Sequence, residues 1–319
     1  MRFIGFSNEK LKIINSIAPK IPSDSKLRKF LRKYEDAILG YTFLLPDIVG
    51  LFIFWSLPMI YVFYLSFFDW DLIGDKIFIG LDNYINLFND GLWWHSLWVT
   101  VKYLIVYVPL VISIALFFAV LLTKKTRGIN MFRTIYFIPY SISLVIVGAV
   151  WAYIFEPRFG IVNYLLETLG IPAGQWLSSA DQALWVIVFV ASWKYMGYYM
   201  ILFIAGLQEI PKDYYEAASI DGAGKFTSFR YITLPSLKPV LFFVLVICII
   251  HGFEVFELVY TMTQGGPNNA TYISMLYVYE QAFLYFDFGY ASAMSFMLFV
   301  IIFIVTMFQY IIFRQNESN

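Results

Sequence analysis

The chain has 319 residues, of which 60% are hydrophobic and only 14% are charged, and its mean hydropathy is +0.70. Soluble domains carry roughly a quarter charged residues, so this composition excludes an ordinary soluble protein and favours an integral membrane protein. Lysine plus arginine equals aspartate plus glutamate, so nucleic acid is not expected as a partner. The single cysteine and the two widely separated histidines indicate neither an intrachain disulfide nor a metal site.

The first 36 residues are rich in lysine and arginine and contain no long apolar run. The positive-inside rule predicts that such a segment stays in the cytoplasm. Residues 1–36 are therefore expected to form a basic cytoplasmic segment ahead of the membrane domain, which takes up residues 37–319.

Six apolar segments follow, each long enough to cross the hydrocarbon core, which takes about 20 residues of helix. They are expected at residues 39–68, 96–122, 132–155, 183–207, 240–262 and 289–313. Shorter helices are expected between spans, at 161–169 and within 272–286. Basic clusters fall on one side of this arrangement and most loop carboxylates on the other, which places both termini in the cytoplasm. The sequence predicts an all-α integral membrane protein with six transmembrane helices.

The loop at about 208–239, between the fourth and fifth spans, is the longest polar run of the membrane domain. It must lie outside the hydrocarbon, where unpaired backbone groups cost several kcal/mol each. Residues 214–220 are expected to form two helical turns, with Asp213 at their N-terminus and a left-handed Gly222 ending them. A second helical piece is expected at 223–231. The sequence therefore predicts two short helices joined by a turn, which form a surface available to a soluble partner.

This loop carries a spaced motif. Glu216-Ala217-Ala218 is followed after three residues by Gly222, and after nine more by Ile232-Thr233-Leu234-Pro235. The pattern resembles the EAA signature of permease subunits in binding-protein-dependent ABC importers, and its extended form is similar to the carbohydrate-uptake, maltose-type group. The Gly-Gly-Pro turn at 265–267 and Tyr277-Val278-Tyr279 also resemble that group. The resemblance covers most of residues 39–313 and implies the type I ABC importer permease fold.

The resemblance also implies partners and roles. It implies a second permease subunit, two cytoplasmic ATPase subunits that bind ATP and magnesium, an extracytoplasmic solute-binding protein, membrane lipid and a sugar substrate. The chain would be a multi-pass protein of a prokaryotic cell membrane with no cofactor of its own. ATPase closure would pull the loop helix as a lever and open the spans alternately to each side. The residues expected to couple to the ATPase are Tyr215, Glu216, Ala217, Ala218, Asp221, Gly222 and Ala223.

Ionisable residues inside spans are expensive, about 2.5–3.5 kcal/mol on insertion scales, so they are candidates for function. The fourth and fifth spans carry Lys194, His251, Glu254 and Glu257, and Tyr195 and Tyr198 flank the lysine. The resemblance implies that these six residues line a cavity, where their polar heads and rings suit a polyhydroxylated ligand. They could instead be structural. In that case Lys194 pairs with Glu254 or Glu257, His251 bonds a backbone carbonyl, and the tyrosines belong to an interfacial belt.

Alternative functions stay open from the residues alone. The same machine could carry a non-sugar solute such as a glycerol phosphate or a peptide, and Lys194 would suit an anionic one. A secondary carrier would work without ATP. A membrane enzyme is disfavoured because no catalytic pairing such as H-E-x-x-H occurs, and Gly222 to Lys225 lacks the spacing of a phosphate-binding loop. ATP hydrolysis is therefore expected in a partner subunit.

Overall fold

The computed structural model describes residues 35–123, 127–253 and 255–315. The chain divides into two compact units, Met1–Tyr61 and Val62–Asn319. The first unit's helix α3 (Glu35–Leu51) runs on through the π-helical turn η1 (Phe52–Ser56) into α4 (Leu57–Leu65), which gives a span-length apolar stretch from Leu39 to Leu65. The first span is thus confirmed at nearly the predicted bounds. The basic segment before residue 35 lies outside the described residues.

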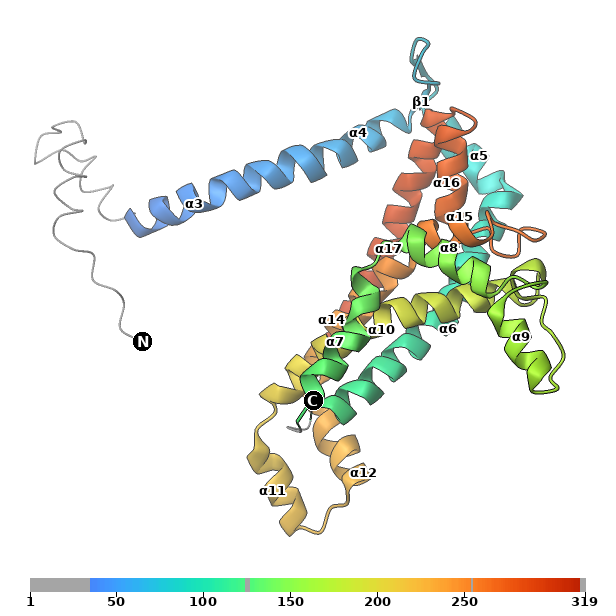
Figure 1. Ribbon diagram of the computed structural model, residues 1–319. Coiled ribbons are helices and arrows are strands. Elements are labelled where there is room, and N and C mark those ends of the chain that lie inside the picture. The colour runs from blue at the N-terminus through green and yellow to red at the C-terminus, as the bar shows by residue number, and fades with distance from the viewer. Residues whose placement is uncertain (1–34, 124–126, 254, 316–319) are drawn as a thin grey trace, which may run out of the picture. The chain divides into compact units, whose positions relative to one another are not determined.

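The second unit is built on long apolar helices (Figure 1). Three of them could each cross a membrane unaided: α6 (Gly91–Leu122), α10 (Ala183–Glu209) and α17 (Phe288–Gln315). Two further candidates are bent pairs of helices. Over the described residues, length and composition give four spans, or up to six if each bent pair counts as one. This agrees with the helical membrane fold expected from the sequence.

Two of the predicted spans are not continuous helices. The third is divided into α7 (Ile129–Ser141) and α8 (Leu144–Ile154), whose axes differ by 97°. The fifth is divided into α14 (Lys238–Phe253) and α15 (Phe256–Met262), and α14 itself makes a 68° bend with the short helices before it. The halves beyond the two breaks pack together, because Gly148 on α8 leaves room for Thr261 on α15. Mean hydropathy does not separate the halves, because the few polar residues at the breaks, Ser141 and Ser143 in the first and Glu254 in the second, lie within strongly apolar segments.

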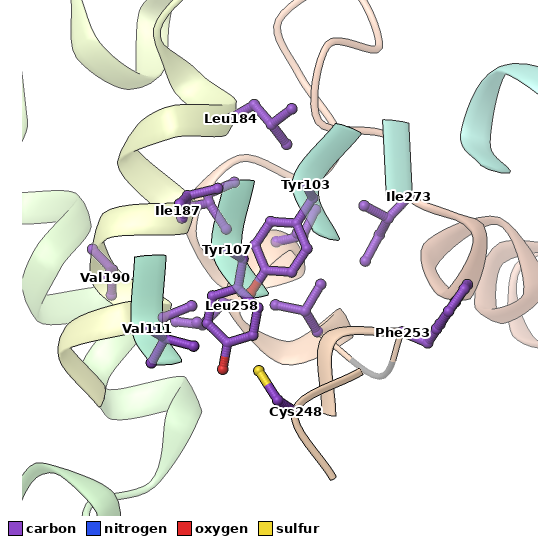
Figure 2. Close-up of a cluster of buried hydrophobic side chains, with 14 of the residues drawn as sticks. Tyr103, Tyr107, Val111, Leu184, Ile187, Val190, Cys248, Phe253, Leu258 and Ile273 are labelled. Atoms are coloured by element: carbon purple, nitrogen blue, oxygen red, sulfur yellow. The ribbon is translucent and has the colours of Figure 1, made fainter. Parts of the chain in front are cut away.

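The interior of this unit is organised around α10, which is the most buried of the span-length helices. It packs along α6, where Tyr103 and Tyr107 are fully buried and stack with their ring centroids 5.0 Å apart. Figure 2 shows these two rings between side chains of α10 on one side and Cys248 and Leu258 on the other. Burial of such large side chains fixes the relative position of α6, α10, α14 and α15.

Short elements gather at one end of the helices. A two-stranded ribbon, β1 (Phe68–Asp69) and β2 (Ile77–Phe78), precedes α5 (Asp82–Asn89), and α16 (Ser274–Phe283) precedes α17. The Asn83 amide donates to the carbonyls of Ser66 and Phe68, which ties α5 to the ribbon. Two further short elements, α9 (Ile161–Thr168) and the 3-10 turn η2 (Trp176–Ser178), lie between α8 and α10 in the chain. Helices expected from sequence at 161–169 and within 272–286 are confirmed as α9 and α16.

Asp90 joins three helices at this end. One carboxylate oxygen caps α6 by accepting from the amides of Leu92 and Trp93, at 2.8 and 3.3 Å. The other accepts from the hydroxyls of Tyr277 on α16 and Tyr290 on α17, at 2.6 and 2.7 Å. Capping explains why α6 begins at Gly91, five residues before the predicted start of the second span. We call this arrangement the Asp90 joint.

The Asp90 joint gives a stability prediction. Partial burial works to raise the pKa of Asp90, but the two phenol and two amide hydrogen bonds outweigh it and hold that pKa below its ordinary value. A lowered pKa in the folded state stabilises at pH above the unfolded value of about 4, and the contribution is lost as pH falls through the folded pKa. Asp90→Ala should lower the apparent Tm in detergent more than Asp90→Asn, which can still cap the helix.

The measurement is a thermal shift series on the wild type and both variants. Because hydrogen bonds to a charged group contribute about 1.5–3 kcal/mol, the gap between wild type and Asp90→Asn should be clear at neutral pH. It should close as the solution is acidified and the wild-type carboxylate takes up its proton. A gap that stays constant down to the lowest pH would contradict a charged Asp90 in the folded state.

The opposite end carries the polar loop of residues 210–237. Its helical elements are α11 (Lys212–Ile220), α12 (Lys225–Ser228), the π-helical turn η3 (Phe229–Thr233) and α13 (Leu234–Ser236). The last turn of α17 lies here too, because Phe313 contacts Phe242 at the start of α14 with ring centroids 5.2 Å apart. The guanidinium of Arg133 closes the end of α6 by donating to the carbonyl of Leu122.

Candidate functional site

The first candidate site is the surface of α11 and the turn that follows it. Ala223 donates to the carbonyl of Ala218 at 2.8 Å and Gly222 donates to Ser219 at 3.1 Å, the paired bonds of a Schellman cap. Gly222 has φ of +79°, the left-handed conformation that the cap requires. The helix and its terminating glycine are thus confirmed as predicted, although the second helical piece begins at Lys225 rather than at residue 223.

The residues expected to couple to an ATPase lie on this surface. Glu216, Ala217, Asp221 and Gly222 are exposed, whereas Ala218 and Ala223 are half-buried. Tyr215 turns inward, and its hydroxyl lies 2.9 Å from the hydroxyl oxygen of Thr233. This hydrogen bond fixes α11 to the second half of the loop, so the two parts can move as one body.

The same loop presents large apolar side chains to solvent. Ile220 is 87% exposed and Phe226 is 75% exposed, and Tyr214 and Tyr231 are also more than half exposed. Figure 1 shows α11 and α12 projecting beyond the ends of the longer helices. Several large apolar side chains exposed on one polar loop favour a surface that another protein covers. We call these four side chains the loop apolar patch.

The second candidate site is a set of rings between α7, α10 and α14. Tyr140 stacks on Tyr198 with centroids 4.5 Å apart and planes 13° apart, and the centroids of Tyr195 and His251 are 5.3 Å apart. These four residues are each half-buried. We call them the aromatic cluster. Beneath it, the buried Tyr199 hydroxyl lies 3.2 Å from Nδ1 of His251.

Lys194 lies beside the aromatic cluster but its charge is already engaged. The side chain is 3% exposed, and Nζ donates to the carbonyls of Pro139 and Tyr140 at 2.8 and 2.7 Å and also to that of Ile142. These carbonyls belong to the end of α7, at the break before α8. The sequence suggests either a ligand contact or an ion pair with a glutamate for this lysine. Hydrogen bonding to a helix end was not among those alternatives.

Only one of the two glutamates falls within the described residues. Glu257 is exposed in the first turn of α15, whereas the Lys194 ammonium group donates to the three carbonyls at the end of α7. Glu254 lies outside the described residues. Of the six residues expected to line a cavity, the structure therefore brings together Lys194, Tyr195, Tyr198 and His251.

Tyr140 and Tyr199 are the residues that sequence reasoning missed. Tyr199 follows the two chosen tyrosines directly in α10, and Tyr140 occupies a Pro-Tyr-Ser-Ile-Ser run inside an otherwise apolar segment. Those interrupting polar residues were the available signal. Among the described residues no three His, Cys, Asp or Glu side chains are grouped as metal ligands would be.

Comparison with known proteins decides the family. Residues 111–317 match the model of the family described as binding-protein-dependent transport system inner membrane component. The chain belongs to this family. It is 38% identical to a probable ABC transporter permease protein of Bacillus subtilis, over 89% of this chain and 92% of that one. It is also 38% identical to a trehalose/maltose transport system permease of Thermococcus litoralis, over 85% and 92% of the respective chains.

A solved structure agrees with the fold. A bacterial ABC transporter described as importing the acidic polysaccharide alginate contains a chain that superposes on this permease with a TM-score of 0.75. The two are 24% identical, and the match covers 91% of this chain and 99% of that one. The family match and the curated relatives, rather than this structural likeness, make the permease a membrane component of an ABC importer, which works with partner subunits.

Proposed function

We propose that this permease carries a sugar or oligosaccharide across a prokaryotic cell membrane, in a complex with a second permease, two ATPases and an extracytoplasmic binding protein. The aromatic cluster is the observation that supports a sugar as the substrate. Its stacked rings and the imidazole of His251 combine flat apolar faces with hydrogen-bonding groups, which is the chemistry that binds polyhydroxylated rings. The trehalose/maltose permease among its relatives supports the same substrate class.

The loop end would face the cytoplasm and receive the ATPase. Basic residues are concentrated at this loop, where Lys212, Lys225, Arg230 and Lys238 lie within it or directly after it. That distribution follows the positive-inside rule. The loop apolar patch would be covered by the ATPase, which supplies ATP, magnesium and the hydrolytic chemistry.

The engaged state of Lys194 argues against an anionic substrate such as a glycerol phosphate. An ammonium group has three N–H donors, and three backbone carbonyls accept from this one. A phosphate or carboxylate would have to displace them. A neutral sugar needs no such exchange.

The test is substrate-dependent ATP hydrolysis by the assembled complex with its binding protein in lipid vesicles. Trehalose, maltose and longer neutral oligosaccharides should be compared with an acidic oligosaccharide, glycerol 3-phosphate and a dipeptide. At least one neutral sugar should stimulate hydrolysis and enter the vesicles. Stimulation by the phosphate or the dipeptide alone would overturn the sugar assignment. Uptake by vesicles containing this chain without ATPase would instead indicate a secondary carrier.

His251→Ala connects the aromatic cluster to this activity. Loss of one hydrogen-bonding group and one ring face should remove about 1–1.5 kcal/mol of sugar binding, which is roughly a tenfold rise in the half-saturating sugar concentration. Competition among sugars should change as well. The matched control is Phe243→Leu, an exposed position on the same helix. Equal competition profiles in wild type and His251→Ala would show that His251 is structural only.

A further inference from the structure

The break between α7 and α8 creates a local problem of hydrogen bonding. A helix that ends leaves its last four carbonyls without helical partners. Inside a membrane, each unsatisfied backbone group costs several kcal/mol. Here α7 ends at Ser141, inside a segment whose length and composition suit the hydrocarbon core. Three carbonyls at this end, those of Pro139, Tyr140 and Ile142, all accept from Lys194.

The ammonium group is well suited to this position. It brings three donors to three acceptors, and its positive charge faces the negative end of the α7 helix dipole. The charge also lies 5.6 Å from the centroid of the Tyr140 ring, within cation-π range. Since its N–H groups are used by the backbone, Lys194 has no donor left for a ligand.

We propose that Lys194 is a positioning residue, whose ammonium group fixes the break between α7 and α8 and thereby holds Tyr140 in the aromatic cluster. The inference rests on the proposed function for the role of the cluster, but not for the geometry itself. One turn of α10 contacts α7 at three points, in the body of the helix and at its end. Lys194 binds the end of α7, Gly197 lets the α7 backbone at Tyr136 touch α10, and Tyr198 stacks on Tyr140.

Lys194→Met should release this arrangement. Methionine has a similar length but no donor, so the three carbonyls lose the ammonium group, and that of Pro139 keeps only the amide of Ile142 at 3.3 Å, while the packing volume is nearly kept. The end of α7 should then shift and Tyr140 should leave Tyr198. For transport, the half-saturating sugar concentration should rise about tenfold while the maximal ATPase rate falls less, because the ATPase surface on α11 is not touched.

The experiment measures the geometry directly. Tyr140→Cys and Tyr198→Cys are introduced together in a Cys248→Ala background, which has no other cysteine in this chain. A short bifunctional thiol reagent then reports their proximity in membranes of the assembled complex. With Lys194 present the cross-link should form efficiently, and Lys194→Met should reduce its yield at least fivefold. Lys102→Met is the matched control, because Lys102 is an exposed lysine of α6 that lies over Trp98 rather than at a helix break.

Each outcome decides the proposal. An unchanged cross-link in Lys194→Met overturns it. If Lys194→Met is absent from the membrane, Lys194→Arg decides, since arginine keeps the charge and several donors. An efficient cross-link with sugar affinity within about twofold of wild type supports positioning, whereas an efficient cross-link with a tenfold weaker affinity indicates direct ligand contact and overturns it. The cross-linking test needs no sugar, so its result is valid even if no sugar stimulates ATP hydrolysis by the wild type. That second outcome would overturn the proposed function and leave the positioning role of Lys194 intact.

Discussion

Gly222→Pro should abolish sugar-stimulated ATP hydrolysis and uptake while leaving the membrane helices folded. Proline fixes φ near −65°, but residue 222 has φ of +79°, and the substitution also removes the amide that donates to Ser219. The Schellman cap of α11 cannot form. Glu216 and the loop apolar patch would then be presented in the wrong orientation, so the ATPase would no longer drive the spans.

Two milder variants calibrate this effect. Gly222→Ala meets no neighbouring atom but must hold a left-handed conformation, which costs about 1–2 kcal/mol, so it should lower coupling without abolishing it. Gly224→Ala is the control, since Gly224 has φ of −73° and equally open surroundings. The assays are uptake, ATPase stimulation and co-purification of the ATPase. Normal sugar-dependent hydrolysis in Gly222→Pro would mean that α11 is not the coupling element.

Gly197→Val should prevent the aromatic cluster from forming. A Cβ at this position would overlap the carbonyl oxygen of Tyr136, so the backbones of α7 and α10 are in direct contact. Side-chain overpacking alone costs about 1–3 kcal/mol, and backbone cannot yield as a side chain does. The helices must separate, which breaks the bonds from Lys194 and the stacking of Tyr140 on Tyr198.

The control for this variant lies on the same helix. The nearest atoms to a Cβ at Gly206 are side-chain atoms of Val240 and Leu237, the closest at 2.6 Å, and side chains yield more readily than backbone. Gly206→Ala should therefore assemble and transport, while Gly197→Val should be lost from the membrane or show little transport and a much lower apparent Tm. Equal stability of the two variants would refute the close α7 to α10 contact.

Hydropathy and motif predicted what depends on local chemistry. The apolar segments could be found because charge is expensive in hydrocarbon, and the end of α11 could be found because a left-handed residue favours glycine. The break at residue 142 could not. Pro109 lies within α6 and does not interrupt it, so Pro139 alone was no guide to the end of α7. The donors that make this end tolerable come from Lys194, which is more than fifty residues away along the chain.

The same contrast applies to the candidate site. A charged residue in the fourth span indicated Lys194. The sequence suggested glutamates as its partners, whereas its partners in the structure are backbone carbonyls. Tyr195, Tyr198 and His251 were found because rings and polar heads stood out on adjacent spans. Tyr140 was missed because its place in the cluster depends on a 97° change of direction that no pattern of apolar residues encodes.

The Asp90 joint bears on how such a molecule can move. One carboxylate holds the beginnings of α6 and α17 and the helix α16, so these elements are pinned to one another at that end. Any rotation of α6 relative to α17 must then occur about the Asp90 joint, so the displacement of each helix increases with distance from that joint. The largest displacements would occur at the opposite ends of the helices, where α17 contacts α14. A small movement within the Asp90 joint would reduce them. Weakening the hydrogen bonds of Asp90 should therefore reduce the helix movement produced by the ATPase even where the sugar is still bound.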